Sequence, residues 1–198
     1  MWQRIWQSPD WRYVGITLAV MLLLQLVGPE YFRYERDWLA TGQVWRLVSA
    51  HWVHVGWVHL LLNAASLVIC VTLTSPRWSI KRWLLYTLIM GLGISILIDL
   101  YNPEIGDYAG HSGVLYGLYL LAAINLFARD RLIAVLVLIA IVGKVLMEKF
   151  EVYDFNTGDL IGARVVTDSH LYGLLIAIAI ALVWATYTMN HGPTRQSN

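Results

Sequence analysis

The chain has 198 residues, of which 58% are hydrophobic and 14% charged, and its formal net charge is +1. Soluble domains are usually about 45–50% apolar, so this composition predicts a polytopic membrane protein. The near-neutral charge gives no indication of the basic surface that nucleic acids require, and we expect no nucleic-acid partner. The single cysteine, Cys70, excludes an intrachain disulfide; we expect it to pack against lipid or in the core.

Six apolar runs are predicted to be transmembrane helices. The first begins near Tyr13 and has no small-x-small cleavage site after it, so we interpret it as an uncleaved span. A crossing needs about 20 residues, so the shorter runs must extend into flanking Trp, Tyr and Arg. Ser75-Pro76 closes the second run, and Asn102-Pro103 follows the third. The predicted spans are residues 13–27, 53–73, 83–98, 109–127, 132–147 and 170–189.

No linker, low-complexity tract or internal repeat divides the chain. We therefore predict one all-α membrane domain over residues 1–198, with its core at about 13–189. We predict neither a metal site nor a cofactor.

The loop charges predict the orientation of these spans through the positive-inside rule. With the N-terminus inside, most basic residues are cytoplasmic and nearly all acidic residues lie outside, so we expect both termini in the cytoplasm. The predicted cytoplasmic basic residues are Arg4, Arg12, Arg77, Lys81, Arg82, Arg129, Arg131 and Arg195. The outer acids are Glu30, Glu35, Asp37, Asp99, Glu104, Asp107, Glu151, Asp154, Asp159 and Asp168. The exceptions are Asp10 and Asp130 inside, and Arg33, Arg36, Arg46 and Arg164 outside.

The long first outer segment, residues 29–49, mixes aromatic and charged side chains. Such a mixture suits the headgroup interface, and we interpret its aromatic residues as a membrane-surface anchor. They are Tyr31, Phe32, Tyr34, Trp38 and Trp45.

Unusual polar residues occur in three of the predicted spans. Spans two, four and six all run from outside to inside, so their polar ends meet in the same leaflet. Ionisable groups are costly in hydrocarbon and indicate function there by default. These residues are His54, His59 and Asn63 in span two, Ser112 in span four, and His170 in span six.

Small residues predict a close approach of spans four and six. Gly113 and Gly117 form a small-xxx-small pair, and Gly173 lies three residues after His170. Such an approach would bring the His170 imidazole within hydrogen-bond reach of the Ser112 hydroxyl.

This set of residues indicates acyl-transfer chemistry. A serine hydroxyl needs a base to take its proton, and histidine suits that task. His59, the Asn63 amide and the Ser112 backbone N–H are candidate oxyanion donors. Tyr116 is predicted to pack on the imidazole of His170. We therefore predict a Ser112–His170 dyad.

Other polar residues of these segments receive simpler interpretations. Asp168, two residues before His170, is expected at the water boundary, so no acid is assigned as a third catalytic member. Lys144 and Glu148 are four residues apart and are interpreted as a structural ion pair. His51 and His111 are expected only to face the interface.

The chain resembles the rhomboid family of intramembrane serine proteases. Gln43-Val44-Trp45-Arg46 is similar to the family's Trp-Arg motif, and His54, His59 and Asn63 match its His-x4-His-x3-Asn signature. Gly110-His111-Ser112-Gly113 matches Gly-x-Ser-Gly, Tyr116 the ring-stacking tyrosine, and His170-Leu171-Tyr172-Gly173 the His-x-x-Gly of span six. The resemblance implies a six-span rhomboid-like bundle, a Ser112–His170 dyad, oxyanion donors from His59 and Asn63, and a water-filled cavity opening outwards.

Within that family, the chain is most similar to the rhombosortases. Its small size, bare six-span core and the segment Gly143-Lys144-Val145-Leu146-Met147-Glu148 carry this resemblance, although rhombosortases often have histidine where Tyr116 stands. The resemblance implies a location in the inner membrane with the site opening to the periplasm. It also implies single-span substrates with a C-terminal anchor and a Gly-Gly or small-residue site.

Two other functions remain open at this stage. A general rhomboid protease with other substrates would share every motif. An inactive helix-binding or chaperone relative would usually have lost the serine or the histidine, and this chain keeps both. A channel or transporter is disfavoured because we find no repeat and no ion-coordinating pair of broken helices.

Overall fold

The computed structural model describes residues 11–38, 40–74, 78–150 and 157–191. Within them, six long helices occur where the apolar runs predict them, which confirms the all-α fold. They are α1 (Trp11–Val27), α3 (Trp57–Thr74), α4 (Ile80–Tyr101), α5 (Ser112–Leu126), α6 (Arg131–Lys149) and α8 (Asp168–His191). Some predicted features lie outside the described residues. They are the break at Ser75-Pro76, both chain termini, and the charged residues Arg4, Asp10, Arg77, Glu151, Asp154 and Arg195.

Among the described residues, two helices are long and apolar enough by themselves to cross a membrane, namely α4 and α8. A third candidate is the pair Arg46–Trp52 and Trp57–Leu73, which is bent by 84°. Helices α1 and α5 are apolar but shorter. Large apolar side chains such as Leu23, Leu132 and Val183 are exposed on the bundle surface, as expected for a protein surrounded by lipid. The fold is that of a polytopic membrane bundle. That the chain crosses the membrane six times remains a prediction.

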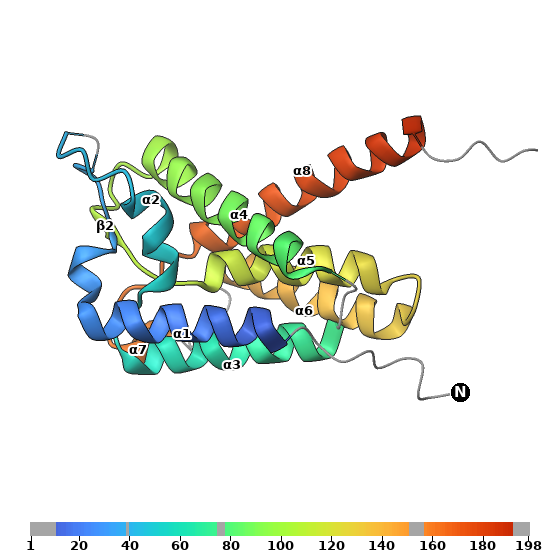
Figure 1. Cartoon of the computed structure of the whole chain (residues 1–198), viewed down its shortest axis with the longest axis horizontal. Coiled ribbons are helices and arrows are strands. Elements are labelled where there is room, and N and C mark those ends of the chain that lie inside the picture. Colours follow the sequence, from blue (N-terminus) through green and yellow to red (C-terminus); the bar gives the residue numbers. More distant parts are fainter. Residues whose placement is uncertain (1–10, 39, 75–77, 151–156, 192–198) are drawn as a thin grey trace, which may run out of the picture.

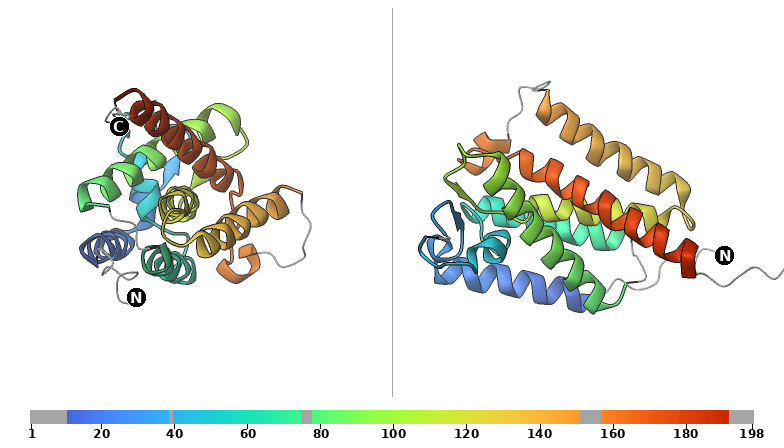
Figure 2. Two further views of the ribbon diagram at one scale, coloured as in Figure 1. Left: turned by 90° about the vertical axis from the view of Figure 1, so that its right-hand side faces the viewer. Right: turned by 90° about the horizontal axis from the view of Figure 1, so that it is seen from above.

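Helix α5 lies at the centre of the bundle and is ringed by the others (Figure 2). It packs against α8, α6, α3 and α4. Most of its residues are buried, from Gly113 to Leu126. A helix that is apolar on all sides is usually buried in the middle of a bundle. The first residue of α5, Ser112, therefore lies among the other helices.

Glycines bring α5 and α8 into backbone contact. A Cβ added at Gly173 would lie 2.0 Å from the Gly113 carbonyl oxygen, and one at Gly117 would lie 2.7 Å from the Gly173 carbonyl oxygen. A larger residue at either position would separate the helices. This crossing fixes the beginning of α8 beside the beginning of α5.

Helix ends follow from local chemistry. The Asp130 side chain accepts a hydrogen bond from the Ile133 backbone N–H at 3.1 Å and caps α6. This acid is therefore accounted for as a helix cap, although the charge rule left it as an exception. Helix α1 ends before Gly28, which has a φ of 133° and is followed by Pro29.

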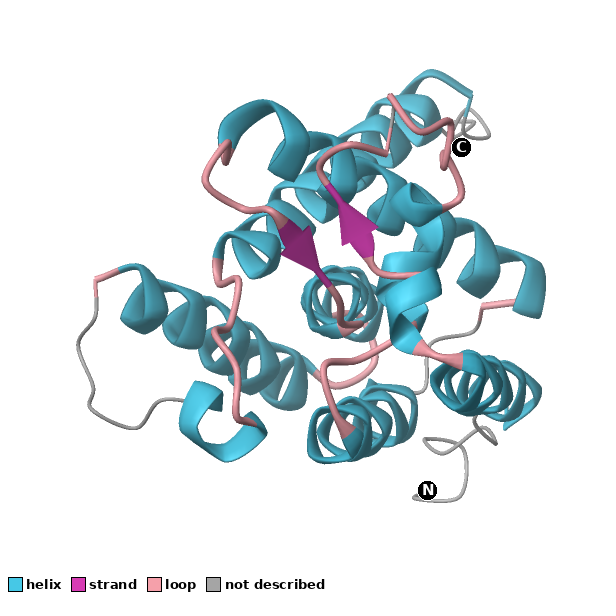
Figure 3. Ribbon diagram, turned by 90° about the vertical axis from the view of Figure 1, so that its left-hand side faces the viewer, coloured by secondary structure: helices cyan, strands magenta, loops and turns pink. Residues whose placement is uncertain are grey.

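One end of the bundle carries the short elements (Figures 1 and 3). The two strands pair in antiparallel fashion, with Tyr34 opposite Tyr108 and Glu35 opposite Asp107. Sequence patterns did not predict these elements because each is only two to five residues long. They are η2 (Pro29–Tyr31), β1 (Tyr34–Glu35), α2 (Arg46–Ser49), η3 (Ala50–Trp52), β2 (Asp107–Tyr108) and α7 (Thr157–Ile161).

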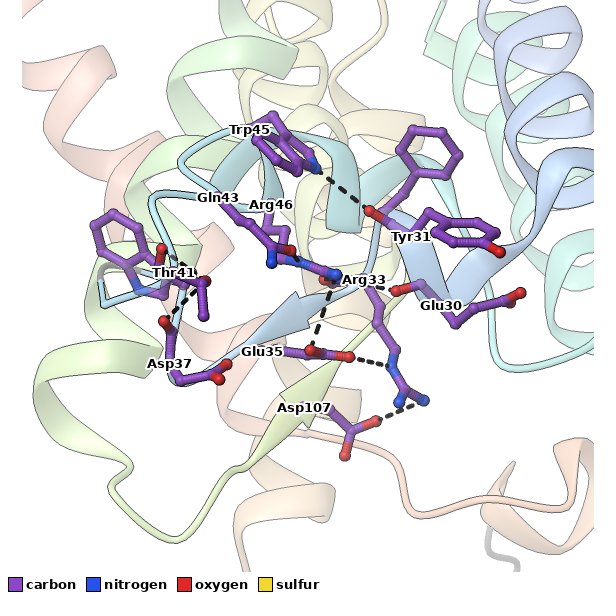
Figure 4. A network of polar contacts seen from close by, with 12 residues as sticks. Glu30, Tyr31, Arg33, Glu35, Asp37, Thr41, Gln43, Trp45, Arg46 and Asp107 are labelled. Carbon is purple, nitrogen blue, oxygen red and sulfur yellow. Dashed lines mark hydrogen bonds and ion pairs between the residues drawn. The ribbon is translucent and has the colours of Figure 1, made fainter.

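Arg46 ties the first outer segment together (Figure 4). Its buried guanidinium donates to the backbone carbonyls of Glu30 at 2.9 Å and Arg33 at 2.7 Å, and to the Gln43 side chain. A weaker ion pair joins it to Glu35 at 3.8 Å. The arginine of the Trp-Arg pair thus has a structural role in this loop.

Arg33 and Arg36 also meet acidic partners on this side. Arg33 pairs with Glu35 at 3.1 Å and with Asp107 at 3.5 Å. Arg36 contacts Asp99 and donates to the Asn102 carbonyl at 2.6 Å, where α4 ends. These contacts explain why arginines occur among the predicted outer acids.

The prediction that the aromatic residues of this segment form a surface anchor is wrong for Tyr34. Tyr31 and Trp45 are exposed, but Tyr34 is fully buried and its hydroxyl donates to Asp99 at 2.6 Å. Burial and the hydrogen bond to Asp99 raise the pKa of Tyr34, so the hydroxyl keeps its proton. Trp38 donates its indole N–H to the same carboxylate at 3.2 Å. Cys70 is buried, in agreement with the expectation for a small core residue.

Candidate active site

The turn before α5 places Ser112 at the first residue of the helix. Gly110 has φ of 144°, and a Cβ there would lie 2.7 Å from Cε1 of His59, so only glycine fits. The Gly110 N–H donates to the Ala50 carbonyl at 3.0 Å. Both the conformation and the close approach of His59 therefore require glycine at this position.

His51 and His111 hold this turn from the inside. His111 Nδ1 contacts the His51 carbonyl oxygen at 2.8 Å, and His51 Nε2 contacts Ser95 Oγ at 3.0 Å. Both rings are buried. The expectation that they face the interface is therefore wrong, because their ring nitrogens join the turn to η3 and α4.

Ser112 and His170 meet as the sequence predicts. Ser112 Oγ lies 2.9 Å from His170 Nε2, a normal hydrogen-bond distance. The Tyr116 ring stacks on the imidazole, with ring centroids 4.4 Å apart and planes inclined by 21°. Tyr116 lies one helical turn after Ser112 in α5, which places its ring beside His170. The stacked ring restricts rotation of the imidazole.

Glu148 is the residue that the sequence interpretation missed. Its Oε2 lies 2.7 Å from His170 Nδ1, and its Oε1 lies 2.7 Å from Lys144 Nζ. The predicted ion pair with Lys144 exists, but the same carboxylate also contacts the imidazole. The expectation that no acid is well placed beside this pair is therefore wrong: Glu148, at the C-terminal end of α6, contacts the ring nitrogen of His170 that faces away from Ser112.

A carboxylate can only accept hydrogen bonds, so the proton of a neutral His170 lies on Nδ1. Nε2 then carries the lone pair that faces the Ser112 hydroxyl. The contact with Glu148 thus selects the imidazole tautomer that can act as a base toward serine.

Asp168 is turned to other partners. Its carboxylate accepts from the Asn102 amide at 3.0 Å and from Lys149 at 3.0 Å. Tyr172 donates to Asn102 at 2.7 Å and extends this network. These contacts attach the beginning of α8 to the end of α4. The acidic partner of His170 is therefore Glu148 and not Asp168.

His59 and Asn63 line the same cavity as Ser112 and His170. His59 Nδ1 is buried and has no hydrogen-bond partner among the described residues. The Asn63 amide donates to the His59 carbonyl at 3.0 Å and has a second N–H. Both side chains are therefore near the serine, with N–H capacity for a developing oxyanion.

His54 supports this arrangement from behind. It is fully buried, and its ring meets that of His59 edge-on, with centroids 5.0 Å apart. Its backbone exchanges two hydrogen bonds with the Gln25 side chain, at 2.9 and 3.0 Å. His54 thus fixes the approach to α3 and does not line the cavity.

The cavity has a volume of about 440 Å³ and is mainly apolar. It lies between α3 and α6, which both pack on α5, and it extends from Ser112 to the level of Tyr119. A second cavity of about 270 Å³ shares His59 and Ser112 with it and is lined by residues 104–109 and 163–166. Ile161 and Val165 border both cavities.

Nothing in the described part of the chain suggests a bound metal, because its His, Cys, Asp and Glu side chains do not form a group of three or more that could hold one.

Residues 41–187 match the Rhomboid domain. The chain belongs to the rhomboid family. Among similar curated proteins, RHOMBOID-like protein 2 of Arabidopsis thaliana is 42% identical over 76 residues, which cover 38% of this chain and 24% of that protein. Rhomboid protease GluP of Bacillus subtilis (strain 168) is 28% identical over 120 residues, 56% of this chain and 23% of GluP.

A third rhomboid relative, the putative rhomboid protease YdcA of Bacillus subtilis (strain 168), is 32% identical over 97 residues. That match covers 48% of each chain. The matched segments thus span about half or less of each of these three relatives.

Proposed function

We propose that the chain is an intramembrane serine endopeptidase with Ser112 as nucleophile and His170 as general base. The observation that carries the proposal is the 2.9 Å contact between Ser112 Oγ and His170 Nε2 on the wall of an apolar cavity. A hydroxyl and an unprotonated imidazole nitrogen at this distance are the nucleophile and base of acyl transfer.

The reaction begins when Ser112 Oγ attacks the scissile carbonyl and its proton passes to His170 Nε2. The tetrahedral intermediate collapses to an acyl-enzyme as His170 returns that proton to the leaving amine. A water molecule then attacks the ester, with His170 as base again, and the released acid and free serine complete the cycle.

The oxyanion is proposed to bind between the start of α5 and the side chains of α3. The first four N–H groups of a helix have no partner within it, and the helix dipole favours negative charge there. Ser112 is the first residue of α5. Its N–H, the His59 ring and the Asn63 amide are the proposed donors.

We propose that the end of the bundle that carries Ser112 and the short elements faces the periplasm, and that both termini are cytoplasmic. The positive-inside rule disfavours arginines on the outer side, which is the main objection to this orientation. Arg33, Arg36 and Arg46 each have an acidic partner there, which removes the objection. The test replaces the exposed Asp159 with cysteine in a Cys70→Ala background and labels intact cells. Labelling by an impermeant maleimide supports the orientation, and labelling only after inner-membrane permeabilisation contradicts it.

The proposed substrates are single-span proteins anchored by a C-terminal helix, processed in the rhombosortase manner at a Gly-Gly or small-residue site. Glycine destabilises a helix by about 0.8–1.0 kcal/mol relative to alanine, so such a site unwinds readily toward Ser112. The apolar cavity between α3 and α6 suits the adjoining helical segment. A basic cluster after the helix would hold it with its C-terminus inside.

Co-expression with a tailed reporter tests this proposal. The reporter carries a Gly-Gly site, one apolar helix and a basic cluster, and the C-terminus of the released domain is read by mass spectrometry. We expect release near the outer membrane boundary with the native chain and none with Ser112→Ala. Equal release after the small residues are changed to leucine would defeat the sorting-signal proposal and leave a general rhomboid protease.

A further inference from the structure

We infer that Glu148 is a positioning residue of the catalytic site, so that Ser112, His170 and Glu148 act as a triad. The inference rests on the proposed roles of Ser112 and His170. It goes beyond them because it assigns an acid on a third helix, α6, to the same reaction.

The geometry forms a continuous line of hydrogen bonds. Ser112 Oγ lies 2.9 Å from His170 Nε2, and His170 Nδ1 lies 2.7 Å from Glu148 Oε2. The side chains of His170 and Glu148 are 5% and 6% exposed. A hydrogen bond to an ionised acceptor that is shielded from water is strong and directional.

Lys144 holds the other carboxylate oxygen and explains how the acid can be buried. A buried carboxylate needs a charged or hydrogen-bonding partner. Lys144 Nζ lies 2.7 Å from Glu148 Oε1, and the lysine side chain is 42% exposed. One oxygen is therefore fixed by the lysine one turn earlier, which directs the other oxygen to His170.

A purely structural ion pair does not account for this arrangement. An (i, i+4) pair on a helix surface needs no third group. Here the Glu148 side chain is the more buried of the two, and it contacts His170 directly at the wall of the cavity that Ser112 also lines. Asp168 is nearer to His170 in the sequence but accepts from Asn102 and Lys149 instead.

The chemical role follows from charge. When Ser112 attacks, its proton moves to His170 Nε2 and the imidazole becomes cationic. Glu148 stays ionised throughout, accepts the Nδ1–H, and stabilises that cation. It also holds the tautomer in which Nε2 is free to receive the proton. Glu148 itself neither gains nor loses a proton.

The experiment measures the rate of Ser112 labelling by a fluorophosphonate, resolved into the maximal rate and the half-saturating probe concentration. The variants are Glu148→Gln, which keeps size and loses charge, and Glu148→Asp, which keeps charge. Asp168→Asn is the matched control, because it removes another carboxylate that is fixed near the start of α8. Thermal unfolding in detergent checks that each variant is folded.

We expect Glu148→Gln to lower the maximal rate by about 10²–10⁴-fold with little change in half-saturation, since a triad acid acts through its histidine. Glu148→Asp should recover part of that loss, and Asp168→Asn should lose far less than Glu148→Gln. A folded Glu148→Gln protein with the native rate would overturn the inference. So would equal losses in the Gln and Asp variants.

The failure of the inference and the failure of the proposed function are distinguishable. Native labelling that survives Glu148→Gln but not Ser112→Ala would remove Glu148 from the site and leave the protease proposal standing. Absence of labelling in the native chain would contradict the protease proposal itself.

Discussion

The contact between α5 and α8 predicts a severe effect of a single added methyl group. In Gly173→Ala, the new Cβ would lie 2.0 Å from the Gly113 carbonyl oxygen, whereas real Cβ contacts are essentially never shorter than 3.0 Å. The helices must therefore separate by about 1 Å. The obstacle is backbone, so rotation of a side chain cannot relieve it.

That separation acts directly on the proposed dyad. Ser112 begins α5 and His170 lies three residues before Gly173, so the 2.9 Å contact would lengthen beyond a useful hydrogen bond. A misplacement of about 1 Å at a catalytic site can lower the rate by about 10²-fold. Overpacking of this kind also costs about 1–3 kcal/mol of stability.

Gly143→Ala is the matched control for this variant. Gly143 lies in α6, near Lys144 and Glu148, yet a Cβ there would meet nothing within 4 Å. The assay compares Ser112 labelling rates and thermal unfolding in detergent. We expect a loss of about 10²-fold for Gly173→Ala and none for Gly143→Ala. Native rate and stability in Gly173→Ala would refute the backbone contact.

Further predictions concern the dyad, the oxyanion donors and the first outer segment. Ser112→Ala and His170→Ala should each abolish reporter cleavage, and the double variant should be little worse than either, because the members of a dyad act as a unit. His59→Ala or Asn63→Ala should each lower kcat by about 10²–10³-fold with a smaller change in KM, measured on the reporter; unchanged turnover in the double variant would remove both from the oxyanion site. Arg46→Met should lower stability by about 1–3 kcal/mol in detergent melts, because it removes the buried guanidinium that donates to the Glu30 and Arg33 carbonyls; a native melting curve would contradict that role.

The helices and the serine–histidine pairing could be predicted from the sequence for a physical reason. Long apolar runs indicate which segments are helical, and the charges of the loops predict that the polar ends of spans two, four and six lie on one side. Glycines at Gly113 and Gly173 then indicate which two helices approach closely. The pairing of Ser112 with His170 needs no more than this.

The role of Glu148 could not be deduced in the same way. The spacing from Lys144 shows that the two share a face of a helix, but spacing does not show which neighbour that face meets. A usable signal was present, since span five is predicted to run outward, which would place its C-terminal acid at the level of Ser112 and His170. The (i, i+4) spacing to Lys144 already gives the acid a partner, so the sequence does not by itself point to His170.

Short-range packing explains the other corrections. Tyr34, His51 and His111 occur among polar and aromatic residues that suit an interface, yet all three are buried. Their partners, such as Asp99 for Tyr34 and Ser95 for His51, lie more than 40 residues away in the chain. Unlike the glycines that indicate the approach of α5 and α8, no spacing pattern in the sequence points to these particular partners.

The measurement that tests the central claim most directly is covalent labelling by a fluorophosphonate, followed by peptide mapping. The purified chain is treated in detergent or in vesicles beside Ser112→Ala and His170→Ala. We predict one modified serine, Ser112, and no labelling in either variant. Labelling that persists in Ser112→Ala, or a native protein that resists the probe while folded, would contradict a serine protease centred on Ser112 and His170.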